Sequence, residues 1–145
     1  MTFENLEYKI WMSFRPDRPH ILQDIIHNQP LYQHEINQLI NDVWEDSENI
    51  WTCPDVWEDH WNNYETPAVK KRLIERLFKQ PRILYRAGDP RGQSWTFDRK
   101  VAKFFAMRRM TDKVIHERLV SADEVITIIN GRKEKEVILK VKEAE

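Results

Sequence analysis

The sequence predicts an α+β domain in which a helical N-terminal part of about 80 residues packs on a small split β core. Apolar residues recur at helical spacing in two segments before Pro81. All three glycines and most of the β-type runs follow Pro81. The length of 145 residues suits one domain. We therefore expect a single domain over residues 1–145, mainly helical at 1–80 and β-rich at 81–145.

Two helices are predicted in the helical part. The first covers residues 31–45, where one face carries Ile36, Leu39, Ile40, Val43 and Trp44. Thr66 is expected to cap the second helix, because Pro67 then occupies its first turn and Pro81 ends it. Residues 3–28 contain two prolines and show no clear periodicity, so no element is assigned there.

Five short strands and one helix are predicted in the β-rich part. The strands are 83–85, 94–97, 114–120, 124–129 and 137–141. Asp98 is expected to cap a helix over 99–110. Turns are expected at 87–93, which contains Gly88, and at Asn130-Gly131.

The composition indicates a folded chain for which a cytoplasmic location is expected. Apolar residues make up 41% and aromatic residues 11%, which disfavours disorder. No apolar run approaches the roughly 18 residues of a membrane span, and no export leader is evident at the N-terminus, so no membrane partner is expected. Cys53 is the only cysteine, which excludes an internal disulfide. No metal site is expected, because Pro30 interrupts the one periodic histidine series.

Charge is distributed unevenly along the chain. Residues 1–65 hold 13 acidic and 3 basic side chains, a balance of −10. Residues 66–145 hold 11 acidic and 20 basic side chains, a balance of +9. This asymmetry indicates either an anionic partner for the second part or attraction between the two parts.

Three polar features of the β-rich part point to a site for a phosphorylated nucleoside. Arg86 ends a predicted strand, and guanidinium groups bind phosphate through two parallel hydrogen bonds. Ser94 and Thr96 are two positions apart on a strand, so their hydroxyl groups share one face. Glu134 and Glu136 share a face for the same reason, and a carboxylate beside a sugar stabilises positive charge at its anomeric carbon.

The order and content of these segments resemble the arginine, serine-x-threonine and glutamate-x-glutamate motifs of ADP-ribosyltransferases, the branch that includes many bacterial toxins. The resemblance rests on Tyr85-Arg86, Gly92-Gln93-Ser94-Trp95-Thr96, residues 101–106 and Glu134-Lys135-Glu136-Val137-Ile138. With residues 46–51 included, the sequence is most similar to small uncharacterised phage and bacterial proteins that carry the same motifs. The resemblance spans about residues 40–142 and implies the split β core of this family.

The resemblance implies an NAD site in the β-rich part. Arg86 would bind the phosphates of NAD, with Tyr85 and Gly88 beside it in the same site. Ser94 would position the nicotinamide-side ribose and the catalytic glutamate. Thr96 would stiffen the strand that carries Ser94.

The resemblance also implies a transferase mechanism. Glu136 would contact the ribose 2′-hydroxyl and stabilise the cationic state as nicotinamide leaves. Glu134 would orient or deprotonate the acceptor, a macromolecule for which protein is favoured over nucleic acid. NAD would serve as substrate, and no metal is implied. The expected function is mono-ADP-ribosyl transfer from NAD.

Two other functions compete with this hypothesis. Residues 42–61 alternate tryptophans with acidic side chains, which would suit a non-catalytic inhibitor that binds a partner's basic groove, as in a phage protein acting on a host machine. The same tryptophans are more typical of a small buried core. The +9 balance of residues 66–145 would suit nucleic-acid binding, but no motif that reads DNA or RNA is present.

Overall fold

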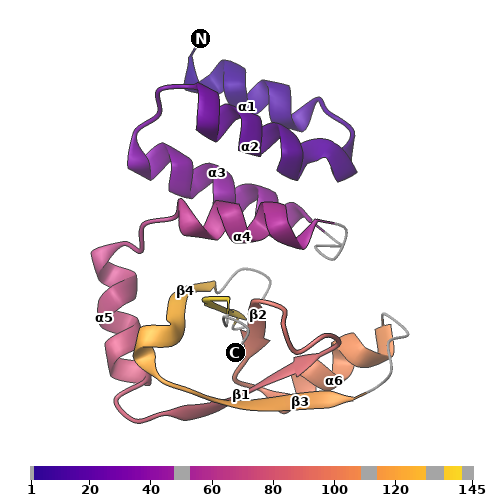
Figure 1. Cartoon of the computed structure of the whole chain (residues 1–145), viewed down its shortest axis with the longest axis vertical. Coiled ribbons are helices and arrows are strands. Elements are labelled where there is room, and N and C mark those ends of the chain that lie inside the picture. Colours follow the sequence, from indigo (N-terminus) through magenta and orange to yellow (C-terminus); the bar gives the residue numbers. More distant parts are fainter. Residues whose placement is uncertain (1, 48–52, 109–113, 130–135, 142–145) are drawn as a thin grey trace. The chain divides into compact units, whose positions relative to one another are not determined.

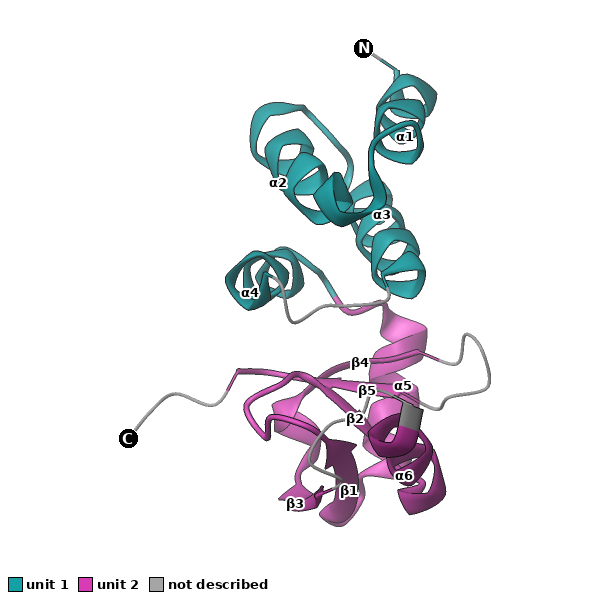
Figure 2. Cartoon of the chain, turned by 90° about the vertical axis from the view of Figure 1, so that its right-hand side faces the viewer, with its two compact units in different colours: residues 1–65 teal, residues 66–145 magenta. Residues whose placement is uncertain are grey.

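The chain is a mixed α+β protein (Figure 1). A computed structural model describes residues 2–47, 53–108, 114–129 and 136–141, which contain six α-helices and a five-stranded antiparallel sheet. The chain forms two compact units, Met1–Glu65 and Thr66–Glu145 (Figure 2). The boundary between the units coincides with the change in charge balance, and the helix predicted after Thr66 belongs to the unit with the sheet.

The first unit is helical. Its helices are α1 (Phe3–Trp11), α2 (Arg18–Asn28), α3 (Gln33–Asp46) and α4 (Pro54–Asn62). Helix α3 confirms the helix predicted at 31–45. Helices α1, α2 and α4 form where the sequence predicted no helix. Thr2 caps α1, and Pro19 lies in the first turn of α2, where a missing N–H is tolerated.

Three tryptophans form the aromatic centre of this unit. Trp44 of α3 meets Trp57 and Trp61 of α4 edge to face, with ring centroids 4.8 and 5.3 Å apart. All three side chains are buried, together with Leu6, Ile10, Leu22, Leu39 and Ile40. The interpretation of these tryptophans as a small core is therefore confirmed.

The second unit is built on the sheet. Its strands are β1 (Arg82–Ala87), β2 (Ser94–Thr96), β3 (Ile115–Val120), β4 (Val125–Ile129) and β5 (Glu136–Leu139), in the spatial order β3-β1-β2-β5-β4. The five predicted strands are confirmed, with small differences at their ends. Helix α6 (Arg99–Arg108) connects β2 to β3, and Asp98 caps it by accepting a hydrogen bond from the N–H of Lys100.

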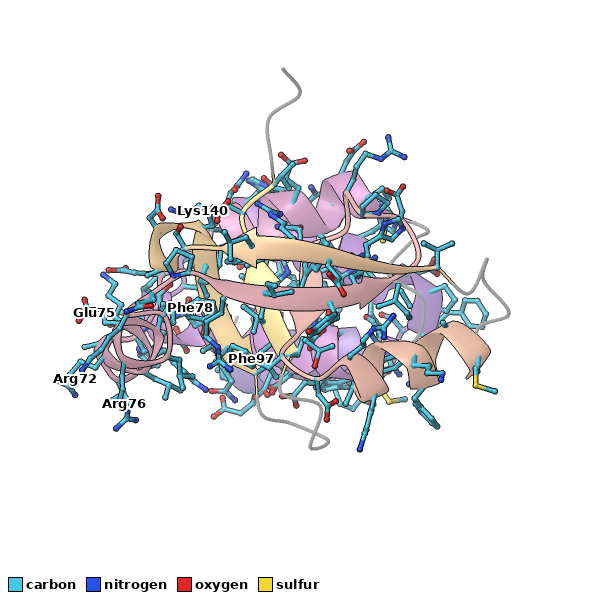
Figure 3. All side chains as sticks on the ribbon, turned by 90° about the horizontal axis from the view of Figure 1, so that it is seen from below. Arg72, Glu75, Arg76, Phe78, Phe97 and Lys140 are labelled. Carbon is cyan, nitrogen blue, oxygen red and sulfur yellow. The ribbon has the colours of Figure 1, made fainter. Side chains whose placement is uncertain are left out.

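Helix α5 (Ala68–Leu77) and the following residue cover one face of the sheet. Ile74 and Phe78 pack there in a core with Leu84, Trp95, Val120, Val125, Ile128, Val137 and Leu139. Figure 3 shows α5 almost end-on at one side of the sheet, with Arg72 and Arg76 pointing away from it. The hydrophobic periodicity of this segment therefore marks the face that binds the sheet.

The predicted role of Thr66 as the cap of α5 is wrong. Pro67 is the N-terminal cap, and the Thr66 hydroxyl instead donates to the carbonyl oxygen of Ile126. One turn later, Lys70 Nζ donates to the carbonyl oxygen of Ile128 at 2.7 Å. Both acceptors belong to β4, which ends the strand order and so presents unpaired carbonyl groups at its outer edge. The hydroxyl group satisfies a strand carbonyl rather than a helix N–H.

Candidate functional site

The two hydroxyl residues of the serine motif lie on β2, the central strand of the sheet. Trp95, between them, is buried in the core that α5 covers. Successive side chains of a strand point to opposite faces, so Ser94 and Thr96 lie on the face away from that core. On the neighbouring strand β5, Thr96 is paired with Glu136 and Trp95 with Val137. Glu136 therefore shares the face of Ser94 and Thr96.

Ser94 and Glu136 are in direct contact. The Ser94 hydroxyl donates a hydrogen bond to Oε2 of Glu136, across 42 positions of sequence. Both side chains are half-buried. A hydroxyl that donates to a carboxylate restricts the orientation of that carboxylate. The sheet thus brings together two of the predicted site residues, one from the serine-x-threonine motif and one from the glutamate-x-glutamate motif.

A row of paired residues crosses the sheet through Glu136. Strand pairing places Glu117 of β3 opposite Tyr85 of β1, Tyr85 opposite Thr96, Thr96 opposite Glu136, and Glu136 opposite Ile129 of β4. All five residues occupy one face because each is paired directly with the next. Tyr85 and Thr96, both predicted site residues, therefore lie in the same row as Glu136.

Arg86 projects to the other face of β1, on the side of Leu84 and the core. Its side chain is buried and turns into the loop between β1 and β2. There Nε donates to the carbonyl oxygen of Asp89 and Nη1 to that of Ser94, both at 2.7 Å. The guanidinium predicted to bind phosphate is thus joined to the backbone next to the candidate site.

The loop of residues 88–93 is internally bonded. Gly88 opens it with φ of 92°, a left-handed conformation that glycine adopts readily. The Asp89 carboxylate accepts hydrogen bonds from the backbone and side chain of Arg91. Hydrogen bonds from Arg91 lower the pKa of Asp89 to about 2. Gly88 thus shapes the loop beside the site.

Glu134, the first glutamate of the glutamate-x-glutamate motif, lies outside the described residues, as does the predicted Asn130-Gly131 turn. Gly92 was expected to form a turn and was counted within the serine motif, directly before Gln93 and Ser94.

The acidic, tryptophan-rich segment 42–61 contributes buried rings rather than an aromatic surface. Trp44, Trp57 and Trp61 are buried, and Trp51 lies outside the described residues. The Asp46 carboxylate pairs with Arg18 at 2.7 Å and also lies 3.5 Å from Arg15. Part of the acidic charge of this segment is therefore paired within the first unit.

Comparisons with protein-family models, with curated proteins and with solved structures found no match to this chain. Among the described residues, no group of three or more His, Cys, Asp or Glu side chains is arranged to hold a metal ion. None of the described helices has the length and apolar character required to cross a membrane.

Proposed function

We propose that the protein is a mono-ADP-ribosyltransferase that transfers ADP-ribose from NAD to a macromolecular acceptor. The observation that carries the proposal is the hydrogen bond from the Ser94 hydroxyl to the Glu136 carboxylate. A serine and a glutamate from the two motifs that resemble this family are neighbours on one sheet face. Thr96 and Tyr85 extend the same row.

The chemistry requires a carboxylate next to the ribose. NAD carries a cationic nicotinamide ring bonded to C1′ of that ribose. When the bond breaks, its electron pair leaves with nicotinamide, which becomes neutral, and positive charge develops at C1′. The Glu136 carboxylate would stabilise this charge, and the Ser94 hydroxyl would hold the carboxylate in position. Positioning and electrostatics suffice, so the proposed reaction uses no metal.

The acceptor completes the reaction. A nucleophilic atom of the acceptor forms the new bond to C1′ and releases its proton, for which Glu134 is the proposed base or orienting group. Protein is the favoured acceptor class, and the proposed location is the cytoplasm. We also infer that the sheet and α6 form a core of the ADP-ribosyltransferase type, because a helix follows the serine motif here as it does in that family.

The test is incubation of the purified protein with labelled NAD and a cell lysate, beside Glu136→Gln. This substitution keeps the shape of the side chain and an acceptor for the Ser94 hydroxyl, but removes the negative charge. Loss of a charge that acts in the transition state is expected to lower labelling on the order of 100-fold. Thermal unfolding of each protein checks that it is folded.

Glu117→Gln is the matched control. Glu117 belongs to the same cross-sheet row, but it lies on the outer strand β3 and is exposed. The Glu117→Gln variant is expected to transfer label from NAD to the acceptor at the wild-type level. Full labelling by Glu136→Gln would refute the proposal. A wild type that neither labels nor cleaves NAD, but binds a partner through Glu58 in segment 42–61, would instead support a non-catalytic role.

A further inference from the structure

The β1–β2 loop encloses the buried guanidinium of Arg86. This group bonds the carbonyl oxygens of Asp89, early in the loop, and of Ser94, at the start of β2. One side chain thus links both ends of the loop. The second bond holds the backbone of Ser94, the residue whose hydroxyl contacts Glu136.

Gly92 lies directly against this guanidinium. A Cβ atom at position 92 would lie 2.0 Å from Nη2, 2.1 Å from Cζ and 2.4 Å from Nε of Arg86. These distances are far below van der Waals contact, so any side chain at position 92 would displace the guanidinium or the loop. Only glycine allows the planar group to lie where it bonds both carbonyl oxygens.

Gly92 is itself held from two sides. Its N–H donates to the carbonyl oxygen of Asp89 at 3.1 Å, and its own carbonyl oxygen accepts from Nε1 of Trp95 at 2.8 Å. Trp95 is buried in the core of the sheet. The adjacent residue, Gln93, exchanges hydrogen bonds with the backbone of Leu139 on β5. These bonds hold the loop backbone on both sides of Gly92, so a side chain at position 92 would displace the Arg86 guanidinium.

We propose that Gly92 is a positioning residue of the transferase: it provides the surface on which the Arg86 guanidinium lies, and that guanidinium holds Ser94 against Glu136. This inference rests on the proposed function. In this scheme Arg86 affects the rate of the reaction by positioning Ser94. If Arg86 instead bound the phosphates of NAD, it would affect the affinity for NAD.

The test is a double-mutant cycle on NAD cleavage by the full chain, using Gly92→Ala, Arg86→Lys and the double variant. Displacement of a reacting group by about 1 Å lowers rates on the order of 100-fold, so each single variant is expected to lose kcat to about this extent. KM for NAD is expected to stay within about threefold of the wild-type value, because uniform substrate binding is untouched. Lysine keeps the charge of Arg86 but lacks the planar fork that bonds two carbonyl oxygens.

The kcat of the double variant is expected to be no lower than that of either single variant. A flexible lysine leaves room for a methyl group at position 92, so the two losses have one cause and do not add. Arg91→Ala is the matched control, because Arg91 lies in the same loop with its side chain 89% exposed and should leave kcat near the wild-type value. Circular dichroism and thermal unfolding verify folding. If Gly92→Ala does not fold, the kcat and KM values of Arg86→Lys decide the test.

Three results would overturn parts of this scheme. An active wild type with an unchanged kcat in Gly92→Ala would refute the positioning role alone. A rise in KM with an unchanged kcat in Arg86→Lys would assign Arg86 to phosphate binding and refute the link through Ser94. A wild type that does not cleave NAD would refute the proposed function, and the inference with it.

Discussion

Acidification should destabilise the first unit through one buried histidine. His60 is inaccessible to solvent, and its Nε2 donates to the carbonyl oxygen of Pro19 at 2.8 Å. Its other ring nitrogen, Nδ1, is buried and has no hydrogen-bond partner among the described residues. A second proton on this ring would place a charge in a site from which water is excluded. Burial therefore lowers the pKa of His60 from 6.5 to about 4.

The sign and size of the effect follow from proton linkage. Between these two pKa values the unfolded chain binds a proton at His60 and the folded chain does not, so the free energy of unfolding decreases as the pH falls. The full difference between the two pKa values lowers the free energy of unfolding by about 3 kcal/mol below pH 4. At pH 5 the free energy of unfolding is already about 2 kcal/mol lower than at neutral pH. Above about pH 7 the ring is neutral in both states and the effect vanishes.

The measurement compares urea unfolding of the wild type and His60→Gln at pH 7.5 and pH 5, followed by circular dichroism and tryptophan fluorescence. Glutamine keeps an N–H donor for Pro19 but does not titrate. The pH-dependent loss of stability should be about 2 kcal/mol smaller in the variant. The nearby contact of His27 with Asp59, at 2.8 Å, is present in both proteins, so the comparison isolates His60. Equal pH dependence in the two proteins would refute the reasoning.

Two further predictions concern the second unit. Lys70→Met should lower the free energy of unfolding by about 1 kcal/mol, because it removes the donor to the Ile128 carbonyl group and keeps the aliphatic stem; urea unfolding measures the loss, and an unchanged midpoint would contradict it. Arg91→Ala should raise the pKa of Asp89 from about 2 toward its ordinary 3.8, because the hydrogen bonds from Arg91 lower it; a carboxyl NMR titration that leaves this pKa unchanged would disprove the assignment.

The sequence predicted secondary structure well wherever hydrophobic periodicity was strong. The helix at 31–45 and the five strands follow from the spacing of apolar residues, which depends only on neighbours in the chain. Helices α1 and α2 were missed because the prolines at 16 and 19 suggested interruption. In the fold, Pro16 lies in a short 3-10 turn and Pro19 in a first helical turn, where each is tolerated.

The candidate site could be predicted in part. Ser94, Thr96 and Glu136 were chosen from their period of two and from a family resemblance, and their common sheet face follows from that period. That Ser94 would lie beside Glu136 was expected from the family resemblance alone. The period of two could not show it, because the register between β2 and β5 depends on contacts between distant segments.

The sequence by itself determined helix α3, the five strands, the order of the motifs and the charge difference between residues 1–65 and 66–145. The tertiary structure alone decided the partner of each polar side chain. Thr66 was expected to cap a helix and instead bonds β4, and Arg86, expected to bind a ligand, bonds the loop around Gly92. The physical reason is that periodicity is a local property, whereas a hydrogen-bond partner is set by whichever group packing brings within about 3 Å.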